Sequence, residues 1–239
     1  MVKVTPNILI RSTSQYCKRR LDEPLEKYLG RLTHLYMNNK GIDDVGEALK
    51  PCTNLQVLYL YENRLTKIPD LSRSPSLTHL YLQQNDITRI HNLDALFNLE
   101  KLFLSGNKIS VLEGLESQSK LRELRIDHQR LPAGEGIIFD DQSLMAIKAR
   151  LSCHFIKFRT PLDLSASGVN NLQSLECLQY LERLDVGSNQ LADESDVLSV
   201  LSKMTHLSEL NISGNPIMKN LRINDRIIIA TKALGTYDW

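Results

Sequence analysis

The sequence predicts an α/β solenoid of about eight repeats, right-handed, with a curved parallel sheet on its concave face and short helical or 3₁₀ segments on its convex side. Two observations predict it. The pattern LxxLxLxxNxL recurs, and three consecutive copies begin 22 residues apart, at Leu55, Leu77 and Leu99. An asparagine occupies the ninth position of five copies, as Asn63, Asn85, Asn107, Asn189 and Asn215. Further copies begin at Leu32, Leu121, Arg159, Leu181 and Leu207.

Each part of the repeat has a physical role. The LxL core predicts a short strand with inward leucines, because side chains alternate along a strand, and these leucines are buried only against neighbouring repeats. The asparagines are expected to form a structural ladder, since an amide both donates to and accepts from backbone groups at the turns. Lys40, Gln129 and Ser167 replace the asparagine in the first, fifth and sixth repeats. Apolar residues three positions apart, such as Ile68 and Leu71, predict the short helical or 3₁₀ convex side.

The domain boundaries follow from the repeat spacing. Residues 1–28 are expected to form a helical N-terminal cap, and residues 29–239 form the solenoid, with a C-terminal cap over 215–239. Leu121 and Arg159 are 38 residues apart instead of 22, so the fifth repeat is expanded over 121–158. Within it, residues 140–151 predict a helix, and residues 152–161 predict an irregular stretch that disturbs the sixth repeat.

Both ends of the predicted solenoid need a cap, because an open stack exposes apolar surface. Thr5 before Pro6 and Asp22 before Pro24 mark two helix starts in the N-terminal cap. Three leucines are expected to cover the first repeat: Leu21, Leu25 and Leu29. At the other end, the segment Asp225-Arg226-Ile227-Ile228-Ile229 predicts a closing helix.

The outward strand positions carry the predicted binding site. The position between the two strand leucines is aromatic in four consecutive repeats (Tyr36, Tyr59, Tyr81 and Phe103), and Tyr61 lies beside them. Adjacent strands are ~4.8 Å apart, so these rings predict a continuous row. Exposed aromatic rows mark protein interfaces. The alternative interpretation is that the tyrosines fill the pleated surface because tyrosine favours strands.

The later repeats place polar residues on the same face. Arg125, Asp163 and Asp185 take the position of the aromatic side chains, and we expect them to contact a partner. Asp163 and Asp185 lie on adjacent predicted strands, where a catalytic carboxylate pair is the alternative. The favoured interpretation is an acidic contact patch offset by Arg125 and Arg183, because no histidine or metal-ligand spacing accompanies it.

Composition and motifs exclude other classes. Of 239 residues, 42% are hydrophobic and 24% charged, and the net charge of +1 disfavours a nucleic-acid or anionic-membrane binder. An RNA-binding protein that stacks bases on the tyrosines is therefore a weaker hypothesis. Four cysteines without a CxxC pair suggest reduced thiols and no metal, and neither a signal peptide nor a membrane span is evident. We expect a cytoplasmic protein with no cofactor and no catalytic residues.

Several segments resemble a known family. Leu58-Tyr59-Leu60-Tyr61, the stretch from Leu77 to Gln83, Leu112-Glu113-Gly114-Leu115-Glu116 and Gln129-Arg130-Leu131-Pro132 resemble the 22-residue leucine-rich-repeat subclass of protein phosphatase 1 regulators. The resemblance implies a non-catalytic scaffold that docks the protein phosphatase 1 catalytic subunit on its concave face. It also implies association with the cytoskeleton and the centrosome, the microtubule organizing center. The alternative is an adaptor that binds tubulin, actin or a motor complex independently of phosphatase.

Such regulators often carry a short docking motif, in which a basic residue precedes Val or Ile, any residue, and Phe or Trp. The nearest match is the segment from His154 to Phe158, which lacks Lys or Arg at its first place. An apolar plug or irregular loop is the better interpretation of this segment. The concave face is therefore the favoured docking surface.

Overall fold

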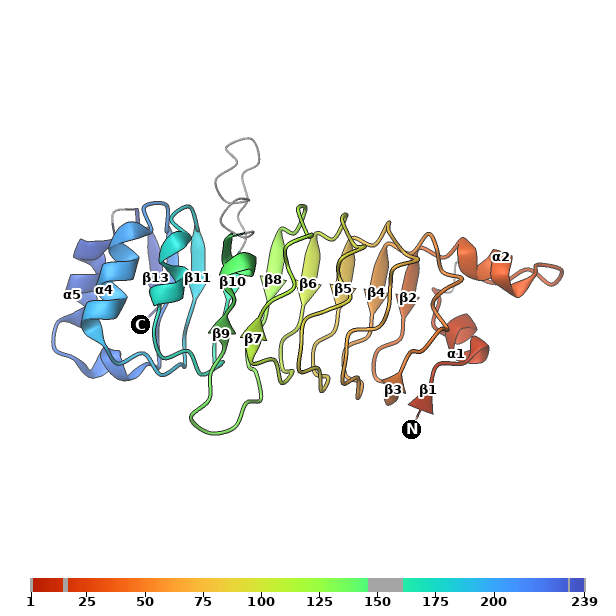
Figure 1. The fold of residues 1–239 in the computed structure, drawn as a ribbon, viewed down its shortest axis with the longest axis horizontal. Coiled ribbons are helices and arrows are strands. Elements are labelled where there is room, and N and C mark those ends of the chain that lie inside the picture. Colours follow the sequence, from red (N-terminus) through yellow and green to blue (C-terminus); the bar gives the residue numbers. More distant parts are fainter. Residues whose placement is uncertain (1, 15–16, 146–160, 232, 239) are drawn as a thin grey trace. The chain divides into compact units, whose positions relative to one another are not determined.

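The computed structural model describes residues 2–14, 17–145, 161–231 and 233–238. The chain consists of two compact units, and Figure 1 labels their helices and strands along the ribbon. The first comprises Met1–Lys108 and Gly114–Leu121, and the second comprises Ile109–Glu113 and Arg122–Trp239. Each unit is built around parallel strands that the repeat pattern predicts.

The first unit contains four repeat strands in consecutive register. These are β2 (His34–Tyr36), β4 (Val57–Tyr59), β5 (His79–Tyr81) and β6 (Lys101–Phe103). They pair in parallel through their central leucines, Leu35, Leu58, Leu80 and Leu102, all of which are fully buried. The flanking residues of each strand point to the other face, as the alternation of side chains requires. The predicted strands and parallel pairing are confirmed.

The second unit contains the other four predicted strands and one more. They are β8 (Glu123–Arg125), β10 (Pro161–Asp163), β11 (Arg183–Asp185) and β12 (Glu209–Asn211), followed by β13 (Thr236–Asp238). The predicted disturbance of the sixth repeat does not reach its strand, because β10 pairs in parallel with both β8 and β11. β13 pairs with β12 beyond the closing helix, where the repeat pattern does not predict a strand.

The asparagine ladder is buried and fully engaged with the backbone. The Nδ2 atom of Asn85 donates to the carbonyl oxygens of Leu60 (2.9 Å) and Leu82 (3.0 Å), and its Oδ1 atom accepts from the Leu65 N–H (3.0 Å). The same set of bonds recurs at the other four ladder positions, Asn63, Asn107, Asn189 and Asn215. Each asparagine thereby ties one repeat to the one before it.

Two of the three residues that replace the asparagine also form hydrogen bonds with the backbone. Gln129 is buried, and its Oε1 atom accepts from the Ile109 N–H at 2.8 Å. The Ser167 hydroxyl donates to the Ile126 carbonyl at 3.2 Å. Lys40 is exposed at the start of the stack, where its ammonium reaches water as predicted.

The return path differs from the prediction in the first unit. Ile68 and Leu71 are buried as expected, but the return segments 66–76 and 88–98 consist of turns and bends rather than 3₁₀ helix. Two short parallel pairs also form outside the repeat strands. In the first unit, β1 (Val2–Lys3) pairs with β3 (Ile42–Asp44), and in the second unit, β7 (Val111–Leu112) pairs with β9 (Ile138–Phe139). The second unit follows the prediction more closely, with 3₁₀ helices η1 (Gln173–Cys177) and η2 (Pro216–Lys219) and the α-helix α4 (Glu194–Lys203).

The N-terminal cap contains two short helices. α1 (Pro6–Arg11) begins as predicted, with the Thr5 hydroxyl accepting from the Ile8 N–H, and its Leu9 is buried. α2 (Leu25–Gly30) begins after Pro24 rather than at Asp22. Leu29 is buried, but Leu21 is fully exposed, so the expected leucine cover is wrong at that position. Tyr28, which is fully buried, fills that role beside Leu29.

The closing helix is α5 (Ile223–Ala230), which contains the predicted segment and packs against α4. In the expanded fifth repeat, residues 141–145 are helical and Leu144 is buried, while the rest of the predicted helix lies outside the described residues. Within the part of the chain that the structure describes, no helix is both long and apolar enough to cross a membrane.

Candidate protein-binding face

The aromatic residues of the first unit form a contiguous row, which we call the aromatic ladder (Tyr36, Tyr59, Tyr81 and Phe103). The strands place one ring per repeat at the same register. The rings of Tyr36 and Tyr59 stack at 5.0 Å between centroids, and those of Tyr59 and Tyr81 at 4.7 Å, both with planes 9° apart. Phe103 meets Tyr81 edge-on at 5.0 Å. Strand spacing therefore sets the spacing of the rings.

The ladder remains accessible to a partner. Tyr36 is 40% exposed, and the other three rings are partly buried by their neighbours. Burial and the neighbouring Tyr81 and Tyr36 raise the pKa of Tyr59 above its usual value. Its phenol therefore stays neutral at physiological pH, and the ladder offers rings and hydroxyl groups without charge.

Polar side chains border the ladder on the same sheet face. Tyr61 lies edge-on to Tyr59 at 6.4 Å between centroids. His79 is partly stacked beside Tyr81 at 6.4 Å, and its Nδ1 atom lies 2.8 Å from the Thr78 hydroxyl. His34 has the corresponding contact with Thr33, at 3.0 Å. The face thus combines an apolar centre with hydrogen-bonding groups at its border, a composition common in protein interfaces.

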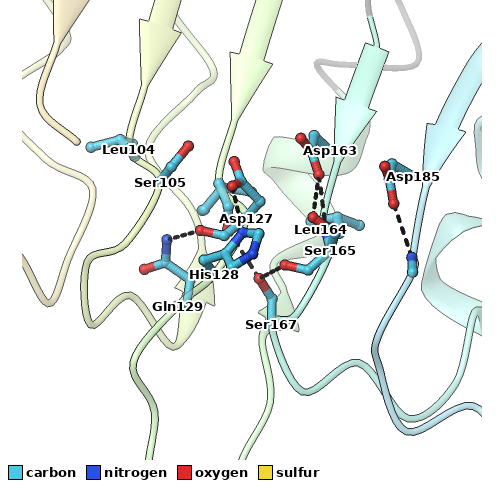
Figure 2. Close-up of polar contacts among 12 residues, drawn as sticks. Leu104, Ser105, Asp127, His128, Gln129, Asp163, Leu164, Ser165, Ser167 and Asp185 are labelled. Carbon is cyan, nitrogen blue, oxygen red and sulfur yellow. Dashed lines mark hydrogen bonds and ion pairs between the residues drawn. The ribbon is translucent and has the colours of Figure 1, made fainter. Parts of the chain in front are cut away.

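The second unit presents a polar face at the corresponding strand positions (Figure 2). The Oδ1 atom of Asp163 accepts from the N–H of Ser165 at 3.1 Å and from its hydroxyl at 2.9 Å. Asp185 accepts from the Gly187 N–H at 2.9 Å and from the Asn211 amide at 3.0 Å. These bonds hold each aspartate against the end of its own strand and leave both side chains partly exposed.

The electrostatic environment of Asp163 distinguishes it from the other carboxylates. Burial raises its pKa, and the carboxylates of Asp127 and Asp185 add to the rise, while the bonds from Ser165 oppose it. Asp127 itself contacts the His128 Nδ1 atom at 2.7 Å. The aspartates therefore form an acidic patch in which the middle charge is disfavoured.

The two arginines of this face pair with glutamates. The Arg125 guanidinium lies 3.1 Å from Glu123 on the same strand, and that of Arg183 lies 2.6 Å from Glu209 on the next. Arg125 is also the register partner of Asp163 on the neighbouring strand, so this arginine borders the acidic patch.

Among the described residues, no group of three or more His, Cys, Asp or Glu side chains could hold a metal ion. The segment from His154 to Phe158, considered as a docking motif, lies outside those residues.

Sequence reasoning missed a cavity at the first strand of the ladder. It is lined by Ser14, Cys17, Thr33, His34 and Tyr36. Two of these belong to the N-terminal cap, whose path the repeat pattern does not predict. The repeat pattern therefore carried no signal for this cavity.

Comparisons with known proteins agree with the repeat geometry. A family model described as leucine-rich repeats in two copies matches residues 53–96, and a leucine-rich-repeat model matches residues 177–195 and 203–218. An internalin (inlC2) from Listeria monocytogenes superimposes with a TM-score of 0.69 at 19% identity, over 97% of this chain and 92% of that one. The chain has the leucine-rich-repeat fold.

Two further leucine-rich-repeat neighbours are longer than this chain. A second Listeria monocytogenes internalin (inlF) has a TM-score of 0.64 at 24% identity, and the match covers 89% of this chain but 57% of the internalin. A chain of the LRIM1/APL1C complex has a TM-score of 0.55 at 19% identity, with 89% of this chain and 36% of that one covered. Leucine-rich-repeat proteins are in general protein-interaction scaffolds, and their fold is typically non-catalytic.

Proposed function

We propose that the chain is a non-catalytic scaffold that binds a protein partner through the aromatic ladder. The stacked and at least partly exposed rings of Tyr36, Tyr59 and Tyr81 are the observation that carries this proposal. An aromatic side chain buries roughly 150–250 Å², and tyrosines are frequent binding hot spots. The rings are held by their strands and by one another, so a partner orders few side chains on binding.

The partner that we propose is the catalytic subunit of protein phosphatase 1. Support for this partner comes from the sequence resemblance to leucine-rich-repeat regulators of that phosphatase, the testis regulatory subunits in particular. The acidic patch around Asp163 and Asp185 would supply a second, polar contact. The cytoplasmic location and the association with centrosome and cytoskeleton belong to the same proposal.

The decisive experiment is binding of purified phosphatase 1 catalytic subunit to the double variant Tyr59→Ala/Tyr81→Ala. A single hot-spot ring contributes ~2 kcal/mol or more, and contacting rings are not additive, so we expect the Kd to rise at least about 30-fold. Phe97→Ala is the matched control, because Phe97 is an exposed aromatic residue (57%) on a return segment away from the strands. Circular dichroism should show the same fold for all three proteins.

The outcome also separates the alternative function. Unchanged phosphatase binding by the double variant would refute the role of the ladder, and no binding by the wild type would refute the partner. Co-sedimentation of the purified wild type with microtubules, in the absence of phosphatase, would instead favour the cytoskeletal adaptor that binds tubulin.

A further inference from the structure

The cavity at the first strand of the ladder adjoins Tyr36, the first residue of the aromatic ladder. It has a volume of about 260 Å³ and is walled by Ser14 and Cys17 of the N-terminal cap and by Thr33, His34 and Tyr36. Tyr59 stacks on Tyr36 but does not line the cavity. Tyr36 therefore belongs to the cavity wall, and its stacking partner Tyr59 does not.

The walls of the cavity are fixed by hydrogen bonds. The buried Tyr28 hydroxyl donates to the Cys17 carbonyl at 2.8 Å, and the Arg31 guanidinium donates to the Cys17 sulfur at 3.3 Å and to the Lys18 carbonyl at 3.0 Å. On the other side, the Tyr36 N–H donates to the Ser12 carbonyl at 2.7 Å. A site with walls held in this way loses little conformational freedom when a ligand enters.

Arg31 is itself anchored, which keeps the cap in place. Its guanidinium pairs with the Glu23 carboxylate at 2.7 Å and lies over the Tyr28 ring at 5.0 Å. The guanidinium and the Glu23 carboxylate form an ion pair behind the cavity wall at Cys17. None of the described lining residues carries a carboxylate that could pair with a cationic group in the cavity.

The size and lining of the cavity define what fits. Pockets for drug-sized ligands span roughly 300–1,000 Å³, so this cavity suits a single side chain. The rings of Tyr36, Tyr59 and Tyr81 set a stack of nearly parallel planes with spacings of 5.0 and 4.7 Å. A planar ring placed on the uncovered face of Tyr36 would extend that stack with the geometry that aromatic pairs favour.

We propose that this cavity receives an aromatic side chain (Phe, Tyr or Trp) of the bound protein, which stacks on Tyr36 and anchors the partner at one end of the ladder. This inference rests on the proposed binding function of the ladder and specifies the partner's chemistry at one position. A flexible aliphatic chain would fill the space without the stacking contact. A guanidinium would stack but would find no carboxylate among the described lining residues.

The test uses the whole chain and N-acetyltryptophanamide as the probe, followed by amide chemical shifts in two-dimensional NMR. We expect saturable shifts at Thr33, His34 and Tyr36, with binding at least fivefold tighter than that of N-acetylleucinamide or N-acetylargininamide. Tyr36→Leu should abolish this preference, and Ser14→Phe, which fills the cavity from its wall, should compete with the probe. Phe97→Leu is the matched control and should leave the preference unchanged.

Several results would overturn the inference. These are the absence of shifts at these residues, equal binding of the leucine amide, tighter binding of the arginine amide, or an unchanged preference in Tyr36→Leu. Any of them would leave the ladder interface standing, because that interface is tested by phosphatase binding to the Tyr59→Ala/Tyr81→Ala variant. Conversely, loss of the phosphatase proposal would not alter the amide preference.

Discussion

Replacing Asn85 with alanine tests how the repeats are joined. Asn85 is 1% exposed, and its amide satisfies the carbonyl groups of Leu60 and Leu82 and the N–H of Leu65. Alanine leaves the Leu65 N–H buried without its partner, which costs about 1–3 kcal/mol. The carbonyls of Leu60 and Leu82 keep the bonds from Asn63 and Asn107, and each loses one hydrogen bond worth about 0.5–1.5 kcal/mol. Partial relaxation reduces the total, so we expect the free energy of unfolding to fall by about 3 kcal/mol. Domains of ordinary stability have only about 5–15 kcal/mol to lose.

Urea unfolding followed by circular dichroism measures this change. Asn171→Ala is the control, because Asn171 is exposed and its amide bonds only to the exposed Asn170 side chain among the contacts that the structure gives, so a change within about 0.5 kcal/mol is expected. Asn85→Gln should recover part of the loss, since Gln129 accepts from a backbone N–H at the equivalent position. A loss below about 1 kcal/mol in Asn85→Ala would refute the reasoning that the ladder satisfies otherwise unsatisfiable groups.

Two further predictions concern protonation. Because the folded pKa of Asp163 is raised, the folded state binds more protons than the unfolded state between the two pKa values, and stability should fall as pH rises through that window. Asp163→Asn keeps an acceptor for Ser165 and removes the charge, so its urea midpoint should be higher than that of the wild type at pH 7, with a flatter pH dependence. Burial raises the pKa of the Cys52 thiol to about 11, so Cys52 should react with iodoacetamide at pH 8 more slowly than the partly exposed Cys17 and Cys177, as measured by mass spectrometry. Equal labelling rates would contradict the burial of Cys52.

The repeat strands were predictable because one rule determines them. Strand residues alternate between two faces, so the spacing of Leu58 and Leu60 places Tyr59 outward without further information. The same rule places Asp163 on the outward face of the sixth repeat, although the expanded fifth repeat interrupts the 22-residue spacing before it. Local periodicity was therefore sufficient for the eight repeat strands and for the residues on their outward face.

The turn before each position of the asparagine ladder was not predicted. In every repeat, the residue directly before this position has a positive φ, and only two of these residues are glycine (Gly106, φ 67°, and Gly214, φ 69°). The others include Glu62, Gln84 and Ala166, with φ between 47° and 56°. Side chains other than glycine lose roughly 1–2 kcal/mol in this region. At Glu62 and Gln84, the asparagine that follows offsets that loss through its backbone bonds, an effect of three-dimensional contacts that residue preferences do not reveal.

The caps were the least predictable part because nothing in them repeats. Leu21 and Leu29 are spaced for one helical face, but α2 begins only at Leu25 and leaves Leu21 in solvent. The Arg31 contacts with Glu23 and Cys17 determine where the preceding segment runs. These contacts join residues that no periodic pattern relates, and the cavity beside Tyr36 depends on them.

The stacking of the ladder also determines what a partner can contact. Each ring between two others has both faces covered, so the inner tyrosine Tyr59 offers mainly its ring edge and hydroxyl group. Ring edges carry partial positive charge and hydroxyls donate hydrogen bonds, so both favour oxygen acceptors over cations. A whole ring face is available only where the stack ends. Because a ring face gives more apolar area than an edge, the Tyr36 end is where a single side chain of the partner gains most.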